Sequence, residues 1–270
     1  ATLDVVAIGN ALVDVLSHTT DEFVSCRGMA KGSMQLVDEV SARALYEAMG
    51  PGVEISGGSA ANTVVGVASF GGRAHYVGKV RDDQLGDVFA HDLRSTGVGY
   101  TTRAATSGPS TGRCLILITP DAQRTMHTFL GASARLGPSD VDAELIARGS
   151  ILYLEGYLFD PPEAQEAFRV AAGIAHGARR KVSLTLSDPF CVGRHRAAFL
   201  DLVEHHVDVL FANEAEICAL YGTDFDAALE AVRGHCEIAA LTRSERGSVV
   251  VAHGKAHRID ARPVKAVVDT

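Results

Sequence analysis

Two adjacent glycines followed by an asparagine form the segment whose residue types and spacing are best suited to chemistry. Gly57 and Gly58 precede a predicted helix over Ser59–Phe70, and Asn62 lies one turn into that helix. Because glycine has no Cβ atom, a ligand can approach the bare backbone of such a pair. The start of a helix adds free N–H groups and the positive end of the helix dipole. This segment therefore predicts a binding site for a small polar ligand.

Two further polar residues follow the first predicted strand, Asp4–Gly9. In open α/β sheets, ligands bind beyond the carboxyl ends of the strands. If the chain stays extended there, Asn10 and Asp14 point to the same side, because strand side chains alternate. The Asp14 carboxylate can accept hydrogen bonds from neighbouring hydroxyls of a sugar. The alternative interpretation is a turn asparagine and an exposed aspartate.

Asn213 and Glu216 lie between a predicted strand over Val207–Phe211 and a predicted helix over Glu214–Tyr221. An asparagine N-cap with a glutamate three residues later is a capping box, which is a purely structural arrangement. The same pair at the carboxyl end of a strand could also organise a hydrated Mg²⁺ ion near phosphates. Both interpretations remain open from the sequence.

Other motifs fail on their context. No G-x-G-x-x-G follows the first strand, so a dinucleotide fingerprint is missing. Residues 108–112 match G-x-S-x-G, but the segment contains a proline and leads into a strand, unlike a hydrolase nucleophile elbow. His205 and His206 are adjacent, and no carboxylate cluster completes a metal site beside them.

Composition limits the class of protein. The 270 residues carry a net charge of −8 with no basic run, which argues against a nucleic-acid partner. Five scattered cysteines without a C-x-x-C pair favour reduced thiols. The N-terminal segment lacks the basic region of a signal peptide. No apolar run approaches the ~18 residues of a membrane span. We expect a soluble cytoplasmic protein that binds a small molecule and no membrane.

Short apolar strands alternate with helices along most of the chain, which predicts an α/β fold. The expected strands cover Asp4–Gly9, Ala74–Gly78, Ile151–Glu155, Val182–Leu186, Val207–Phe211, Ile238–Leu241 and Ser248–Ala252. The expected helices cover Asp38–Met49, Ser59–Phe70, Gln84–Thr96, Pro138–Arg148, Pro162–His176, Gly193–His205, Glu214–Tyr221 and Phe225–His235. This order predicts a mostly parallel sheet with helices on both faces.

Two regions break this rhythm, approximately residues 11–37 and 101–130. They carry short alternating segments, among them Cys114–Ile118 and Thr125–Leu130, with no helix expected between them. We interpret them as antiparallel excursions that form a small β lid over the ligand edge of the main sheet. The prediction is one α/β domain over residues 1–270 with this lid attached.

Taken in order, the motifs resemble those of the ribokinase (PfkB) family of carbohydrate and nucleoside kinases. Its N-terminal signature is similar to Gly57, Gly58 and Asn62 with Gly71, Gly78 and Gly86. The family N-x-x-E motif resembles Asn213-x-x-Glu216, and the strand and turn before its nucleotide site resemble Leu241–Gly247. Val268-Asp269-Thr270 resembles the beginning of its C-terminal signature, D-T-x-G-A-G-D. The resemblance implies a ribokinase-like α/β fold.

Within the family, residues 9–14, 184–190 and 209–214 are most similar to adenosine kinases. That likeness implies an ATP- and Mg²⁺-dependent kinase that phosphorylates the hydroxymethyl group of a nucleoside, adenosine to AMP. A kinase of a free sugar such as ribose or fructose is one alternative. A noncatalytic nucleoside-binding protein is another.

The resemblance also implies roles for individual residues. It assigns the ribose to Asn10, Asp14, Gly57, Gly58 and Asn62. It assigns the apolar walls around the base to Met34 and Leu36 of the lid, with Tyr157 or Leu158. It assigns the phosphates and ATP to Arg124, Asn213, Glu216, Thr242 and Gly247, with Glu216 holding Mg²⁺ through water. The alternatives are ordinary packing for Tyr157 and an exposed hairpin position for Arg124.

The C-terminal signature departs from the family pattern because the sequence stops at Thr270. Asp269 matches the first aspartate of the motif, whereas the family's catalytic base is the last one. We therefore expect the C-terminal part with the catalytic base to be missing and a 270-residue product to have little kinase activity. The lid strands have edges that could pair, so the resemblance leaves both a monomer and a lid-mediated homodimer open.

Overall fold

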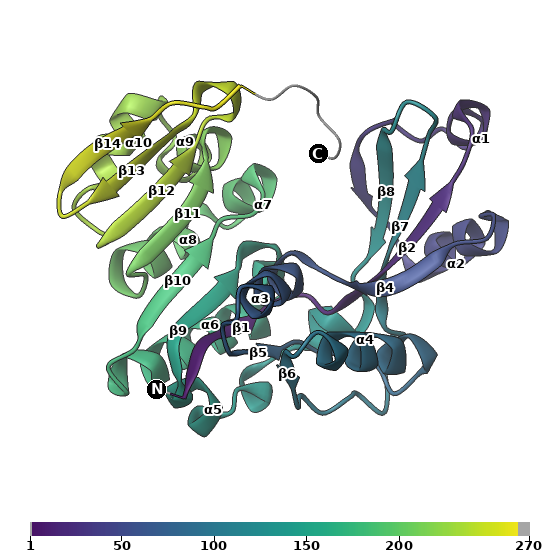
Figure 1. The fold of residues 1–270 in the computed structure, drawn as a ribbon, viewed down its shortest axis with the longest axis horizontal. Helices are drawn as coiled ribbons and strands as arrows, with labels where there is room; N and C mark the ends of the chain where they lie inside the picture. The colour runs from purple at the N-terminus through teal and green to yellow at the C-terminus, as the bar shows by residue number, and fades with distance from the viewer. Residues whose placement is uncertain (1, 264–270) are drawn as a thin grey trace.

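The computed structural model describes residues 2–263, which form two β-sheets with helices packed around them (Figure 1). Within these residues the larger sheet has nine strands in the order β14-β13-β12-β11-β10-β9-β1-β5-β6. Its strands are β1 (Leu3–Ile8), β5 (Ala74–Val77), β6 (Gly99–Tyr100), β9 (Gly149–Glu155), β10 (Lys181–Thr185), β11 (Val209–Asn213), β12 (Ile238–Thr242), β13 (Ser248–Ala252) and β14 (Lys255–Ile259). The strands from β6 to β12 pair in parallel, and β13 and β14 pair antiparallel at one edge.

Helices cover both faces of this sheet. They are α3 (Ser59–Ser69), α4 (Gln84–Ser95), α5 (Ala143–Arg148), α6 (Pro162–Gly177), α7 (Pro189–Arg194), α8 (Arg196–His205), α9 (Glu214–Tyr221) and α10 (Phe225–Val232). Strand β1 shows the two faces, because its side chains alternate. Val6 and Ile8 belong to the core cluster that contains α6, whereas Ala7 belongs to the cluster that contains α3. The predicted mostly parallel sheet with helices on both faces is confirmed.

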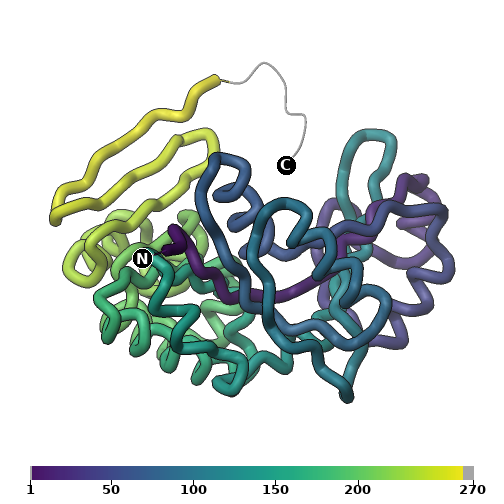
Figure 2. Tube along the Cα trace, turned by 60° about the horizontal axis from the view of Figure 1, so that its bottom comes forward, coloured from purple at the N-terminus to yellow at the C-terminus, as the bar shows by residue number. Residues whose placement is uncertain are grey.

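A second sheet, which we call the lid sheet, projects from the larger one (Figure 1). It has the order β3-β8-β7-β2-β4 and contains β2 (Leu12–His18), β3 (Met34–Leu36), β4 (Val53–Gly57), β7 (Gly112–Ile118) and β8 (Arg124–Phe129). The helices α1 (Asp21–Cys26) and α2 (Glu39–Ala48) belong to this part of the chain. Figure 2 shows the N-terminal segment crossing from β1 directly into the lid sheet.

The lid sheet differs from the sequence expectation in three ways. It includes β4, which lies outside both predicted lid regions, and α1 interrupts the first of them. Its pairing is mixed, because β2 pairs in parallel with β7, and β3 pairs in parallel with β8. The short β4 shows no clean alternation of buried and exposed apolar residues, so local pattern could not identify it. It becomes a strand through antiparallel pairing with β2, a contact distant in sequence.

Several predicted helices have different bounds. The segment Pro138–Arg148 forms a 3₁₀ turn at Pro138–Asp140 and then α5, which begins after Asp142, whose side chain accepts two backbone N–H groups. The predicted helix Gly193–His205 is split at His195 into α7 and α8, because Asp188 caps an earlier start at Pro189. The predicted Phe225–His235 ends at Val232, and β14 was not expected. The predicted motif at Val268–Thr270 lies outside the described residues.

Among residues 2–263, no helix is both long enough and apolar enough to span a membrane. The core beneath the edge of the main sheet is partly aromatic. The ring centroids of Phe159 and Phe199 lie 4.2 Å apart, and those of Phe159 and Phe168 lie 5.7 Å apart. All three side chains are fully buried. This cluster supports the turn Gly156–Phe159 that follows β9.

Replacing Phe168 by alanine is expected to destabilise the protein by about 3–5 kcal/mol, because it removes a buried ring and leaves a cavity. Phe70 provides a matched control, since its side chain is 94% exposed. Phe70→Ala is expected to change the unfolding free energy by less than about 0.5 kcal/mol. Urea unfolding of both variants beside the parent protein measures the difference, and similar losses in the two variants would contradict the prediction.

Candidate functional site

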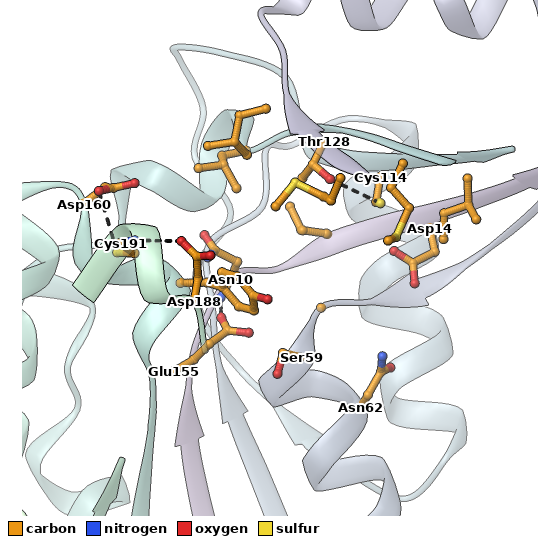
Figure 3. A pocket seen from close by; sticks show the side chains of 18 of the residues that line it. Asn10, Asp14, Ser59, Asn62, Cys114, Thr128, Glu155, Asp160, Asp188 and Cys191 are labelled. Carbon is orange, nitrogen blue, oxygen red and sulfur yellow. Dashed lines mark hydrogen bonds between the residues drawn. The ribbon is translucent and has the colours of Figure 1, made fainter. Parts of the chain in front are cut away.

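A cavity of about 350 Å³ lies where side chains of the lid sheet face those at the carboxyl ends of the main strands (Figure 3). Eight of the predicted site residues line it together: Asn10, Asp14, Met34, Leu36, Gly58, Asn62, Arg124 and Tyr157. These residues come from segments far apart in the chain, and the fold alone brings them together. The structure thus gathers the predicted acceptor residues around one space.

Two predicted residues do not line this cavity. Leu158 is only 1% exposed and packs in the main core, whereas its neighbour Tyr157 faces the cavity. The wall is therefore Tyr157 and not Leu158, because consecutive residues of the turn point in different directions. Gly57 has a different function, since a Cβ atom there would overlap the carboxylate of Asp14. Its missing side chain leaves room for that carboxylate.

The inner face of the lid sheet changes from polar to apolar along its strands. The strand register aligns Asp14 with Cys114, and Cys114 with Thr128, across β2, β7 and β8. The Thr128 hydroxyl donates a hydrogen bond to the Cys114 sulfur at 3.3 Å. The next row along the same strands that lines the cavity is apolar and consists of Ile116, Met126 and Met34. A ligand that spans these rows meets polar groups at one end and apolar side chains at the other.

Met34 and Leu36 remain 43% and 48% exposed, although both are large and apolar. They lie on β3, at the edge of the lid sheet, and both face the cavity. An apolar ligand surface placed against them would remove this area from water, which is favourable. These two residues are therefore suited to an apolar part of a ligand.

Asp14 is the carboxylate at the polar end of the cavity. Burial raises its pKa to about 6, although the positive charge of Arg124 on β8 acts in the opposite direction. Arg124 lines the same cavity, so the exposed-hairpin interpretation of this residue is wrong. Asp14 is a hydrogen-bond acceptor whenever it is ionised, and Arg124 supplies a cation on the same side.

Gly58 is the N-cap of α3 and has a φ of +100°, a conformation that favours glycine. A Cβ atom at this position would overlap the backbone carbonyl of Asn10. Gly58 has no side chain to cap the helix, and the cap comes from elsewhere in the chain. The Glu155 carboxylate, at the end of β9, accepts the N–H of Ala60 at 3.0 Å.

Glu155 is the functional residue that the sequence analysis missed. It is 1% exposed and also accepts the backbone N–H of Asn10 at 2.5 Å. Burial raises its pKa to about 7, and the backbone N–H groups of Asn10, Ala60 and Ser59 partly offset this effect. The available signal was a glutamate ending the apolar strand ILYLE, at the edge of the sheet where ligands bind.

Charged residues also line the end of the cavity opposite Asp14 (Figure 3). Asp160 accepts hydrogen bonds from the Arg194 guanidinium at 2.9–3.2 Å and pairs with His195 Nε2 at 2.8 Å. Asp188 accepts the backbone N–H of Cys191 at 2.7 Å and so caps α7. The sequence analysis assigned no role to these residues.

A second cavity of about 290 Å³ adjoins the first, and Ser59 and Tyr157 line both. Asn213, Glu216 and Thr242 line the second cavity, at the ends of β11 and β12. Gly247 lines neither cavity. It has a φ of +79° in the turn before β13, where a Cβ atom would overlap the carbonyl of Ile259.

The capping box predicted at the start of α9 is confirmed. The Asn213 side-chain oxygen accepts the Glu216 N–H at 2.9 Å, and Glu216 accepts the Asn213 N–H at 2.9 Å. Burial raises the pKa of the Glu216 carboxyl, and the nearby charge of Asp188 adds to this effect. Within residues 2–263, no cluster of three or more acidic, histidine or cysteine side chains could hold a metal ion.

Comparison with known proteins gives a consistent family. A family model described as pfkB family carbohydrate kinase matches residues 37–270. Guanosine-inosine kinase of Escherichia coli (strain K12) is 28% identical over 235 residues, which cover 81% of this chain and 52% of that protein. Fructokinase-1 of Oryza sativa subsp. japonica is 26% identical and covers 72% of this chain and 63% of its own length. The chain thus spans about half of the length of the first of these curated relatives.

Solved structures cover the chain more completely. The adenosine kinase from Sinorhizobium meliloti superposes with a TM-score of 0.90 and 50% identity, covering 100% of this chain and 83% of that one. A probable sugar kinase from Rhizobium etli CFN 42 has a TM-score of 0.90 and 46% identity, covering 100% of this chain and 82% of that one. These likenesses confirm the predicted ribokinase-like α/β fold.

Replacing Gly58 by alanine is expected to destabilise the protein by more than about 1 kcal/mol, because the new Cβ would strain a positive φ and overlap the Asn10 carbonyl. Gly66 on the same helix provides the matched control, since nothing lies within 4 Å of a Cβ placed there. Gly66→Ala is expected to stabilise α3 by about 0.5–1 kcal/mol. Opposite signs in thermal and urea unfolding support this account, and equal effects would refute it.

Proposed function

The chain belongs to the pfkB family of carbohydrate kinases, and we propose that it acts as an ATP-dependent kinase on a nucleoside. The acceptor is the hydroxymethyl group of the ribose, and the reaction converts adenosine to AMP. The S. meliloti structure, 50% identical over the whole of this chain, is named an adenosine kinase. The curated E. coli relative is named a guanosine-inosine kinase, which also acts on purine nucleosides.

The observation that carries this proposal is the division of the first cavity into a polar end and an apolar wall. A nucleoside has the same division, with a sugar rich in hydroxyls and a flat base. Asp14 and Asn62 lie together at one side of the cavity in Figure 3, where we place the ribose hydroxyls. Met34 and Leu36 of the lid and the ring of Tyr157 would then enclose the base. Aromatic and sulfur-containing side chains pack well against such a π-face.

The two adjoining cavities suit an acceptor and a donor that meet at a shared wall. In this proposal the ATP phosphates occupy the second cavity, near Asn213, Glu216 and Thr242. The transferred phosphoryl group would pass near Ser59 and Tyr157, which line both spaces. Arg124 would attract its negative charge from the lid side. Gly247 would act only indirectly, by shaping the turn that follows Thr242.

The residues of the second cavity fit a hydrated Mg²⁺ brought in with ATP. The Glu216 carboxyl is buried beside the charge of Asp188, and a divalent cation would relieve the electrostatic cost of ionising it. Without a cluster of direct metal ligands in residues 2–263, we assign Glu216 to water molecules of the ion. The bound ion would neutralise phosphate charge.

The chain's own residues would contribute positioning and water exclusion. Phosphoryl transfer depends mainly on alignment and electrostatics, and little covalent chemistry is required of the protein. Asn10, Gly58 and Asn62 would orient the sugar from the main body, while the lid sheet covers the acceptor. Such a cover keeps out water, which would otherwise compete as acceptor. The proposal assigns no general base within residues 2–263.

A kinase of a free sugar is the second candidate, and the name of the R. etli structure, a probable sugar kinase, favours keeping it. Ribose or fructose would satisfy Asp14 and Asn62. Either sugar would leave the apolar side chains of Met34, Leu36 and Met126 uncovered. A volume of about 350 Å³ lies within the range of small-molecule pockets and is suited to a ligand larger than a pentose. These two features favour the nucleoside.

The decisive assay measures ADP release by the full-length gene product with ATP and Mg²⁺, offering adenosine, ribose and fructose in parallel. We expect turnover with adenosine. Turnover with a free sugar alone would overturn the assignment of the apolar wall to a base. No turnover with any of the three, together with adenosine binding in calorimetry, would identify a noncatalytic nucleoside-binding protein.

The KM for adenosine is expected to fall as the pH rises from 5 to 7, at saturating ATP. The pKa of Asp14 is raised to about 6, so protonation below this pH removes the acceptor that the sugar hydroxyls need. Asp14→Asn is expected to raise KM at pH 7 by about 10- to 100-fold, since hydrogen bonds to charged groups contribute about 1.5–3 kcal/mol. The variant should also show a flatter KM profile between pH 5 and 7.

Asp226→Asn is the matched control, because its side chain is 83% exposed and lies outside both cavities. This variant should keep the KM and the pH profile of the parent enzyme. A pH profile that is unchanged in Asp14→Asn would show that another group controls the titration.

A further inference from the structure

We infer that Ser133 is a positioning residue of the acceptor site, which fixes the side-chain amide of Asn10 so that its nitrogen faces the ligand. This inference rests on the proposed function for the identity of the ligand. Its geometric basis does not depend on which acceptor is bound. Ser133 belongs to the 3₁₀ turn Gly131–Arg135, which follows lid strand β8 and leads back to the main body.

Ser133 is fully buried and directs its hydroxyl toward Asn10. The Oγ–H group donates to the side-chain oxygen of Asn10 at 2.8 Å, and the backbone carbonyl of Leu130 lies 2.6 Å from the same Oγ. The backbone of the turn is also fixed, because the Ser133 N–H donates to Leu130 O at 3.1 Å. The serine hydroxyl is therefore held at a defined place beside the cavity.

Asn10 has one group left for a ligand. Its backbone N–H donates to Glu155 at 2.5 Å, and its side-chain oxygen accepts from Ser133. Its side-chain nitrogen, Nδ2, is buried and has no partner of hydrogen-bond geometry in the part of the chain that the structure describes. Asn10 is 2% exposed and lines the acceptor cavity. A buried donor without a partner is costly, which indicates a site completed by a ligand.

The orientation of this amide follows from its neighbours. The Asn10 side chain makes a small contribution that lowers the pKa of Glu155, as expected when the amide nitrogen is on the carboxylate side. Exchanging nitrogen and oxygen would turn a carbonyl dipole toward that carboxylate. It would also remove the acceptor that Ser133 contacts at 2.8 Å. Ser133 and Glu155 thus favour the same orientation, in which Nδ2 is the free donor.

This arrangement defines the chemistry of the ligand atom that meets Asn10. The atom must offer a lone pair, as a hydroxyl or ether oxygen or an unprotonated ring nitrogen does. Ionised Asp14, at the same end of the cavity, can only accept hydrogen bonds. Asn10 as donor and Asp14 as acceptor together suit a sugar, whose hydroxyl groups can do both. Without Ser133 the amide could rotate and present its oxygen instead, and the site would lose this complementarity.

A double-mutant cycle on the full-length gene product tests the inference with the acceptor that the wild-type enzyme phosphorylates. Ser133→Ala is expected to raise the acceptor KM by about 5- to 10-fold, as for the loss of about 1 kcal/mol, with kcat within twofold. Asn10→Ala is expected to raise KM further. The double variant should equal Asn10→Ala alone, because Ser133 acts only through Asn10. Ser133→Cys, which retains a weak donor, should fall between wild type and Ser133→Ala.

Ser183→Ala is the matched control. Ser183 is 2% exposed in β10, and its hydroxyl likewise has no partner among the described residues. It lines neither cavity, so its removal should leave the acceptor KM unchanged. Ser133→Cys also keeps the cycle usable if the alanine variant fails to fold.

The outcomes separate this inference from the proposed function. Multiplicative KM effects in the double variant, or a Ser133→Ala variant that loses only thermal stability, would overturn the role of Ser133 while adenosine turnover stands. Turnover of a free sugar in place of adenosine would overturn the proposed function, and the same cycle with that sugar would still decide the role of Ser133. Failure of the wild-type protein to turn over or bind adenosine, ribose or fructose would overturn both.

Discussion

The buried carboxylate of Glu155 is the constraint on which the rest of the site depends. It joins three parts of the fold, because it ends β9, caps α3 through Ala60, and holds the backbone of Asn10 after β1. An ionisable group at 1% exposure is costly unless hydrogen bonds compensate. Here backbone N–H groups provide that compensation, and the raised pKa of about 7 measures what remains of the cost. The site is thus organised around a group that ligands need not touch.

Three glycines can be explained by clearance around this centre. A Cβ at Gly9 would lie 2.5 Å from a Glu155 oxygen, and one at Gly58 would overlap the carbonyl of Asn10. A Cβ at Gly57 would overlap the Asp14 carboxylate. The glycine pair was interpreted from the sequence as bare backbone for a ligand. In the structure it first serves to bring protein polar groups close together, and the ligand space results from that packing.

Features set by local sequence could be predicted, and those set by distant pairing could not. Helix α9 was located with its bounds because Asn213 and Glu216 form a capping box within four residues. The alternation of strands and helices likewise predicted the main sheet. In contrast, β4 depends on pairing with β2, and Ser133 meets Asn10 across 123 positions of the chain. Glu155 combines both cases, since its place at a strand end was visible but its partners were not.

The acceptor site draws on two bodies of the fold, which has a consequence for binding. Asn10, Gly58 and Asn62 belong to the main body, whereas Asp14 and Leu36 lie on strands of the lid sheet. Strand register aligns Asp14 and Leu36 through Cys114 and Thr128, so a movement of the sheet carries both together. A ligand that contacts the polar and the apolar end at once therefore connects the lid to the main body. Ser133 lies where β8 returns to that body, so the residue that orients Asn10 is also attached to the moving sheet.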